Sequence, residues 1–211
     1  MKRLFIHRLM LIVLLPAFIT SVMSGCRNKT DNKHETQAET KTMLSADERN
    51  DPQQIQSYLY AAYRGDADKV LSFLDQGMDI NQVNRNGQSA LMMAAYNGHL
   101  DLVRLCLKKG AGINDRDAGG RTPLMYAASG PFTATVKYLL NHGADPNTVD
   151  QDEKWTALMY AAAEGHLDVV RLLLKRGAVA SVTDVDGDTA ESFARKNGHI
   201  EVADWIKDHS D

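Results

Sequence analysis

The heptapeptide Thr122-Pro-Leu-Met-Tyr-Ala-Ala128 returns at residues 156–162 as Thr-Ala-Leu-Met-Tyr-Ala-Ala and at residues 89–95 as Ser-Ala-Leu-Met-Met-Ala-Ala. Its alanine pair also occurs at residues 61–62, and the four pairs are spaced by 33, 33 and 34 residues. Four glycines keep the same spacing: Gly77, Gly110, Gly143 and Gly177. A constant period of this length indicates stacked structural repeats.

The residue types at each repeat position have a physical role. A Ser or Thr opens each copy, where its hydroxyl can accept amide protons from the first turn of a helix, and Pro123 suits the first helical position. One set of glycines is placed to turn the chain between two helices, and the set above to end the second helix in the left-handed conformation. The capping residues are Ser89, Thr122, Thr156 and Thr189, and the inter-helix glycines are Gly98, Gly165 and Gly198.

The second helix of each unit carries an apolar stripe that it cannot bury alone, such as Leu102, Val103 and Cys106 in the second unit. Stacking of neighbouring units covers these stripes and makes one quasi-one-dimensional core. The end units have a single neighbour and should differ, and they do. The first opens with Asp51-Pro-Gln-Gln-Ile, and the last has Glu191 at a usually apolar position.

Together with Gly98-His-Leu-Asp-Leu-Val-Arg and Gly165-His-Leu-Asp-Val-Val-Arg, these motifs resemble the ankyrin repeat. The resemblance covers residues 51–208 in five units: 51–83, 84–116, 117–149, 150–183 and 184–208. It implies an all-α repeat solenoid in which each unit is a helix-turn-helix followed by a β-hairpin loop. Two units depart from the pattern. Ser129-Gly-Pro-Phe-Thr predicts a distorted inter-helix turn, and Lys154 replaces a hairpin glycine.

The N-terminus predicts a lipoprotein signal. Residues 1–25 combine Lys2, Arg3 and Arg8 with an apolar run too short to span a membrane, and Val-Met-Ser-Gly-Cys26 resembles a bacterial lipobox. The resemblance implies cleavage before Cys26 and acylation of that cysteine, and Arg27 after it implies the outer membrane, facing the periplasm. The alternative is an ordinary cleaved signal. The polar residues 26–50 then predict a flexible tether.

Charge and cysteine content exclude several function classes. Without the first 25 residues, 21 basic residues remain against 27 acidic ones, which argues against nucleic-acid and anionic-membrane binding. Two cysteines exclude a disulfide framework.

No residue pattern predicts catalysis. His99, His166 and His199 recur one repeat apart, too far for a shared metal, and Asp184-Val-Asp-Gly-Asp lacks the spacing of a calcium loop. Met92, Met125 and Met159 indicate core filling, and Cys106 should be buried and unreactive. We expect no enzyme activity, catalytic residue, metal, cofactor or small-molecule substrate.

The ankyrin resemblance implies a concave partner-binding surface made of hairpin tips and first helices. Exposed aromatic and Arg side chains contribute most at interfaces, so Trp155, Tyr96, Tyr63 and Arg121 are the favoured anchors, although the tyrosines could instead pack between units. The nominated residues are Tyr63, Arg64, Gln88, Tyr96, Asn97, Arg121, Trp155 and Glu164.

The sequence therefore predicts a lipid-anchored binding module for another protein in a bacterial envelope. The favoured role is an immunity or inhibitor protein against a toxic enzyme that acts in the periplasm. The alternatives are a scaffold for an envelope enzyme, such as one in oxidative-stress defence, and an uncharacterised enzyme.

Replacing Cys26 with Ser should remove the predicted anchor, because the cysteine sulfur is the atom that receives the diacylglyceryl group. Cell fractionation and labelling with a radioactive fatty acid should then find the chain soluble or unprocessed. A Cys26→Ser chain that is still processed and lipid-labelled would contradict the lipobox prediction.

Overall fold

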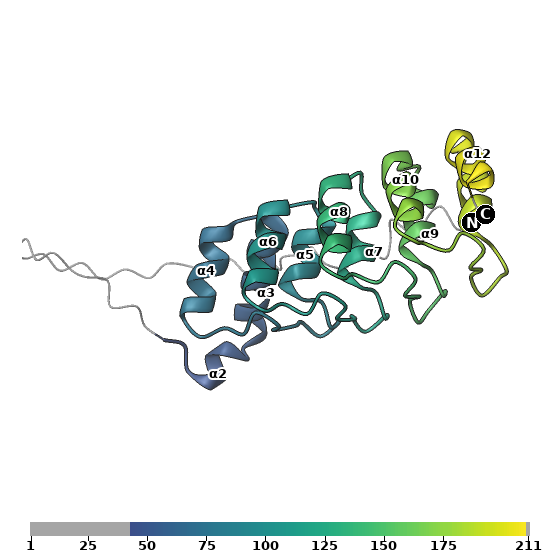
Figure 1. Cartoon of the computed structure of the whole chain (residues 1–211). Coiled ribbons are helices and arrows are strands. Elements are labelled where there is room, and N and C mark those ends of the chain that lie inside the picture. Colours follow the sequence, from purple (N-terminus) through teal and green to yellow (C-terminus); the bar gives the residue numbers. More distant parts are fainter. Residues whose placement is uncertain (1–42, 210–211) are drawn as a thin grey trace, which may run out of the picture. The chain divides into compact units, whose positions relative to one another are not determined.

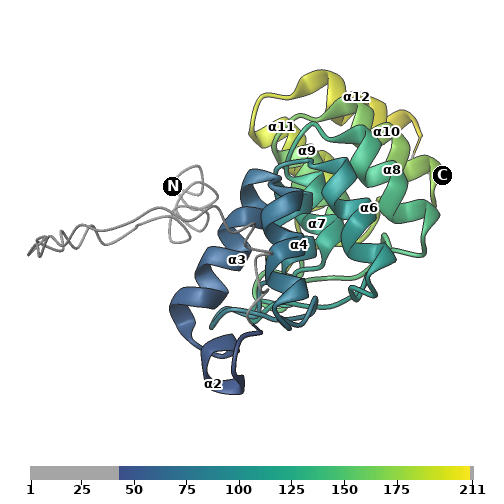
Figure 2. The ribbon, with the colours of Figure 1, turned by 90° about the vertical axis from the view of Figure 1, so that its left-hand side faces the viewer.

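The computed structural model describes residues 43–209, so the predicted signal, Cys26 and most of the predicted tether lie outside the described residues. Helices alternate between two layers (Figures 1 and 2). The inner helices are α3 (Pro52–Arg64), α5 (Ala90–Tyr96), α7 (Pro123–Ala128), α9 (Ala157–Ala163) and α11 (Ala190–Lys196). The outer helices are α4 (Ala67–Asp75), α6 (Leu100–Lys108), α8 (Thr133–Asn141), α10 (Leu167–Lys175) and α12 (Ile200–Asp208).

Neighbouring helix pairs stack in chain order. Each inner helix contacts the next inner helix, and from α6 onward each outer helix contacts the next outer helix. The paired alanines lie in these inner contacts and are at most 3% exposed. Residues 43–209 contain no strand, only an isolated bridge between Val83 and Ser89. The predicted all-α repeat solenoid is therefore confirmed.

The predicted helix caps are confirmed. Ser89, Thr122, Thr156 and Thr189 each accept a hydrogen bond from the backbone amide three residues on. In two units the methionine at that third position completes a reciprocal cap, since its sulfur accepts from the backbone N–H of the capping residue at 3.4–3.5 Å. The methionines are buried, as core filling requires.

The third unit has the distorted turn that its sequence predicts. Gly98, Gly165 and Gly198 turn the chain with positive φ, but in the third unit Gly130 does not take that conformation. Helix α7 ends at Ala128, and the ring of Phe132 lies against Gly98. A histidine ring makes the same contact elsewhere, as His99 does with Gly65, so Phe132 replaces it.

The predicted end of the tether is wrong. Residues 46–49 form helix α2 (Ala46–Arg49), which Ser45 and Glu48 cap reciprocally. The guanidinium of Arg49 donates to the carbonyl of Gly77, and the Leu44 amide donates to that of Gln76. The polar composition concealed this short segment because hydrogen bonds to backbone carbonyls of the first unit hold it there. Within residues 43–209 no helix is long and apolar enough to cross a membrane.

Tyrosine–aspartate hydrogen bonds link hairpin to inner helix in two units. The Tyr126 hydroxyl donates to Asp117 at 2.7 Å, and the Tyr160 hydroxyl to Asp150 at 2.8 Å. Phe193 occupies the equivalent position in the last unit, and the buried Oδ2 atom of its aspartate, Asp184, has no hydrogen-bond partner among the described residues. An unpaired buried carboxylate oxygen weakens this end of the stack.

Replacing Phe193 with Tyr should therefore stabilise the protein, because the new hydroxyl can donate to Asp184. We expect a gain of about 0.5–1.5 kcal/mol in the free energy of unfolding, measured by denaturant titration of the full chain. Tyr160→Phe is the matched control and should lower stability by about 1–3 kcal/mol. A less stable Phe193→Tyr protein would show that the aspartate is satisfied in another way.

Candidate protein-binding surface

Three tyrosine side chains form a continuous row across the first two inner helices, which we call the tyrosine strip: Tyr60, Tyr63 and Tyr96. The rings of Tyr60 and Tyr63 stack with centroids 6.3 Å apart, and those of Tyr63 and Tyr96 with centroids 6.1 Å apart. Tyr60 is 46% exposed, and the other two are half-buried. The strip combines accessible aromatic surface with fixed ring positions, which favours it as an anchor for a partner.

The hydroxyls of the tyrosine strip remain available. Within residues 43–209, no hydrogen bond to the hydroxyl of Tyr60, Tyr63 or Tyr96 is formed. The hydroxyls of the buried tyrosines Tyr58 and Tyr126, in contrast, have protein partners. Burial, followed by the proximity of Tyr63 and Glu164, raises the pKa of Tyr96, so its hydroxyl stays protonated and can donate to a partner.

The structure fixes Arg121 as part of the framework. Its Nη2 and Nε atoms lie 2.7 and 2.9 Å from Oδ2 of the buried Asp117, and its guanidinium lies over the ring of Tyr126 at 5.3 Å. Tyr126 in turn packs edge-on against Tyr96. Arg121 and Tyr126 thus continue the row of contacts from Tyr96 toward α7. The charge of Arg121 is already paired with that of Asp117.

Two nominated residues are buried, so their expected exposure was wrong. Trp155 is 8% exposed, with its ring centroid 4.4 Å from that of Phe193 and 5.1 Å from that of Tyr160. Gln88 is 4% exposed and donates to the Tyr126 hydroxyl at 2.9 Å. The unit that contains most of hairpin 149–155 is one residue longer than the units before it, and the indole of this hairpin packs against Phe193 of the last unit.

The remaining nominated residues lie near the strip or farther along the inner helices. Arg64 is exposed at the end of α3, and Asn97 donates to the carbonyl of Tyr63 at 2.7 Å. Glu164 is half-buried at the end of α9. Sequence reasoning missed Tyr60, although it lies three residues before Tyr63 and therefore on the same helix face.

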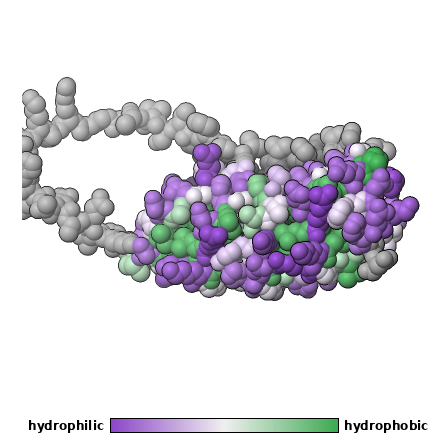
Figure 3. Space-filling model, turned by 45° about the horizontal axis from the view of Figure 1, so that its top comes forward, coloured by the Kyte–Doolittle hydropathy of each residue, from purple (hydrophilic) through white to green (hydrophobic). Residues whose placement is uncertain are grey.

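Among residues 43–209, the outer face has no comparable row of stacked tyrosines. Figure 3 shows apolar residues there as separate green areas between hydrophilic purple ones. Tyr138 packs against the tilted ring of His142 at the end of α8, and Trp205 stacks on His209 at the end of α12. An arginine of the preceding outer helix lies over each aromatic ring, so both rings are partly covered.

The described residues contain no group of three side chains that could hold a metal. His99 and His166 instead hydrogen-bond through Nε2 to the carbonyls of Tyr63 and Ser129 in the preceding unit. Burial raises the pKa of the Cys106 thiol to about 12, which keeps it protonated and unreactive.

The sequence matches the family description "Ankyrin repeats (3 copies)" over residues 58–150 and 132–211. The chain belongs to the ankyrin-repeat family. This family is generally non-catalytic, and its repeats indicate a protein-interaction module. A comparison with curated proteins found no match.

Burial of Trp155 predicts a large loss of stability on truncation. Trp155→Ala should lower the free energy of unfolding by about 3–5 kcal/mol in a denaturant titration, because it leaves a cavity between hairpin 149–155 and α11. Tyr60→Ala removes a ring that is 46% exposed and is the control, with an expected change near 0.5 kcal/mol. Equal effects of the two substitutions would contradict the inward position of the indole.

Proposed function

We propose that this ankyrin-repeat protein is a lipid-anchored module that binds another protein through the tyrosine strip and the inner helices that continue it. The main support is the arrangement of Tyr60, Tyr63 and Tyr96, whose stacked rings are accessible and whose hydroxyls are unpaired within the described residues. Tyrosine suits this role because it offers a large contact area with few rotatable bonds and one polar atom.

Anchoring through Cys26 is the second part of the proposal. Its support is the basic start, the short apolar run and the Ser-Gly-Cys ending of the first 26 residues. A triacylated cysteine would hold the chain essentially permanently in the membrane, since each buried CH₂ group contributes about 0.8 kcal/mol. We place the repeats on the periplasmic side of the outer membrane.

Within this class we propose that the protein inhibits a toxic enzyme that acts in the periplasm. A rigid, non-catalytic surface that is anchored where such an enzyme acts is suited to covering an active site. Deletion of the chain should then sensitise cells to the enzyme. The wild-type chain should restore resistance when it is supplied to the deletion strain, whereas a Tyr63→Ala, Tyr96→Ala double variant should leave the cells sensitive. Loss of a resident envelope activity, with unchanged sensitivity, would instead indicate a scaffold.

Site-specific photo-crosslinking tests the surface in native cells. A photoreactive phenylalanine analogue in place of Tyr96 should capture one partner, identified by mass spectrometry, that the same analogue at Tyr138 on outer helix α8 does not capture. Stronger capture from position 138 would indicate that the binding site lies on the outer face. Trp155 is unsuitable for the probe because its side chain is buried.

A charge reversal separates binding from folding. Glu164→Lys should weaken or strengthen binding of the captured partner while it changes the free energy of unfolding by no more than about 0.5 kcal/mol. Binding titrations and denaturant titrations of the same protein measure the two effects. A Glu164→Lys protein with unchanged affinity would exclude this end of α9 from the interface.

A further inference from the structure

The four hairpin turns form a connected row, which we call the hairpin row: residues 83–88, 116–121, 149–155 and 183–188. One backbone hydrogen bond joins each turn to the next. Ala118 donates to Asn86 at 2.8 Å, Gln151 to Gly119 at 2.8 Å, and Val185 to Glu153 at 3.1 Å. The relative positions of the turns are therefore fixed before any partner binds.

Charge changes sign halfway along the hairpin row. The first turn has Arg85 alone, a net charge of +1, and the second has Arg116 and Arg121 against Asp117, also +1. Among the exposed side chains, the third turn has Asp152 and Glu153 against Lys154, a net charge of −1, and the fourth has Asp186, also −1. The other acidic residues of these turns do not add to this exposed charge, because Asp150 and Asp184 are buried and Asp188 is ion-paired with Lys196. The exposed members are Arg85, Arg116, Asp152, Glu153, Lys154 and Asp186.

This order is complementary to itself under a two-fold rotation. When two copies of the row lie antiparallel, the first turn of one faces the fourth turn of the other, and the second faces the third, so positive turns meet negative ones throughout. A two-fold contact of this kind uses the same surface on both chains. Complementary charge also sets the register and speeds the encounter.

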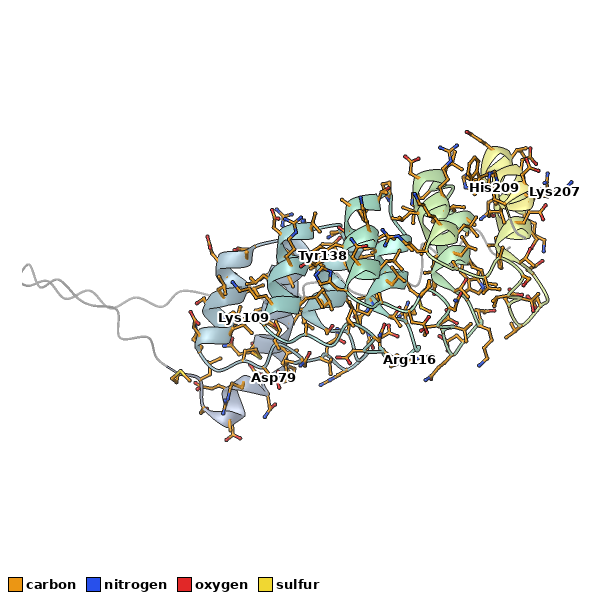
Figure 4. The ribbon with its side chains drawn as sticks, viewed as in Figure 1. Asp79, Lys109, Arg116, Tyr138, Lys207 and His209 are labelled. Carbon is orange, nitrogen blue, oxygen red and sulfur yellow. The ribbon has the colours of Figure 1, made fainter. Side chains whose placement is uncertain are left out.

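Exposed valines repeat the same symmetry independently of charge. Val83 in the first turn is 41% exposed, and Val185 in the fourth turn is 56% exposed. The antiparallel arrangement brings the Val83 turn of each copy to the Val185 turn of the other. The arrangement therefore covers an exposed apolar side chain at both ends of the row. Figure 4 shows Arg116 at the edge formed by the hairpins, away from the helix ends that carry Lys207 and His209.

We propose that a second copy of this chain binds along the hairpin row and forms an antiparallel, two-fold homodimer. The contact uses turns rather than the tyrosine strip, and it does not depend on the proposed function. The contact consists of only four turns, so we expect it to bury less surface than the roughly 1,200–2,000 Å² of stable interfaces, and we expect the dimer to be weak and sensitive to salt.

Sedimentation velocity of the full chain in detergent, over a series of protein concentrations, tests this proposal. The chain should associate into dimers at about 0.05 M salt and less at about 0.5 M, since the Debye length falls from roughly 14 Å to roughly 4 Å. A chain that is monomeric at all concentrations and both salt levels would overturn the proposal. The charged turns would then be candidates for binding a different protein.

Charge-swapped variants test the register. Arg85→Glu with Arg116→Glu should raise the dimer dissociation constant at least about tenfold, and so should Asp152→Lys with Glu153→Lys and Asp186→Lys. An equimolar mixture of these two variants should associate again, because the exposed side chains then give every turn of the first variant a net negative charge and every turn of the second a net positive charge. Lys137→Glu with Lys207→Glu is the matched control on outer helices and should dimerise normally. A mixture that stays monomeric, or a control that dissociates equally, would contradict the register.

Cysteine pairing gives a geometric check that does not depend on charge. In a Cys26→Ser background, mixing Val83→Cys chains with Val185→Cys chains should give an oxidised heterodimer on a non-reducing gel. Each variant alone should give far less, because two-fold symmetry keeps like positions at opposite ends of the row. Equal cross-linking in all samples would overturn the antiparallel arrangement.

Discussion

The fold depends on the close approach of neighbouring inner helices, which the paired alanines permit. These alanines are almost completely buried between α3, α5, α7 and α9. A single unit cannot bury its own apolar stripe, so each unit is stable only when its neighbours pack against it. Larger side chains at the alanine positions would separate the helices and misalign every contact that crosses from one unit to the next.

The tyrosine strip and the hairpin row both depend on the close spacing of the inner helices. Tyr63 of α3 reaches Tyr96 of α5 because the two helices lie close together, and the turns of the hairpin row reach each other for the same reason. Polar contacts reinforce the spacing, as where Asn97 and His99 both bond to the carbonyl of Tyr63. A partner would therefore meet side chains and turns whose positions are already fixed, so little ordering would oppose binding.

Sequence alone predicted those features of the fold that recur in each unit and depend only on the residues nearby in the chain. Capping residues, turn glycines and buried methionines were all found because each depends on its own residue type and spacing. The side chain of Trp155 could not be placed, since its burial depends on Phe193, which belongs to the next unit. Likewise, the buried Gln88 donates a hydrogen bond to Tyr126 of the next unit, and α2 is held by carbonyls of the first unit. No local pattern reveals these contacts.

The alanine spacing can be tested with one enlarged side chain. Ala95→Leu on α5 should lower the free energy of unfolding by about 1–3 kcal/mol in a denaturant titration, because leucine overpacks the contact between inner helices. Ala134→Leu on α8 adds the same atoms at an exposed position and should change stability by no more than about 0.5 kcal/mol. If Ala95→Leu were tolerated as well as Ala134→Leu, close packing of the inner helices could not be the constraint on which the structure depends.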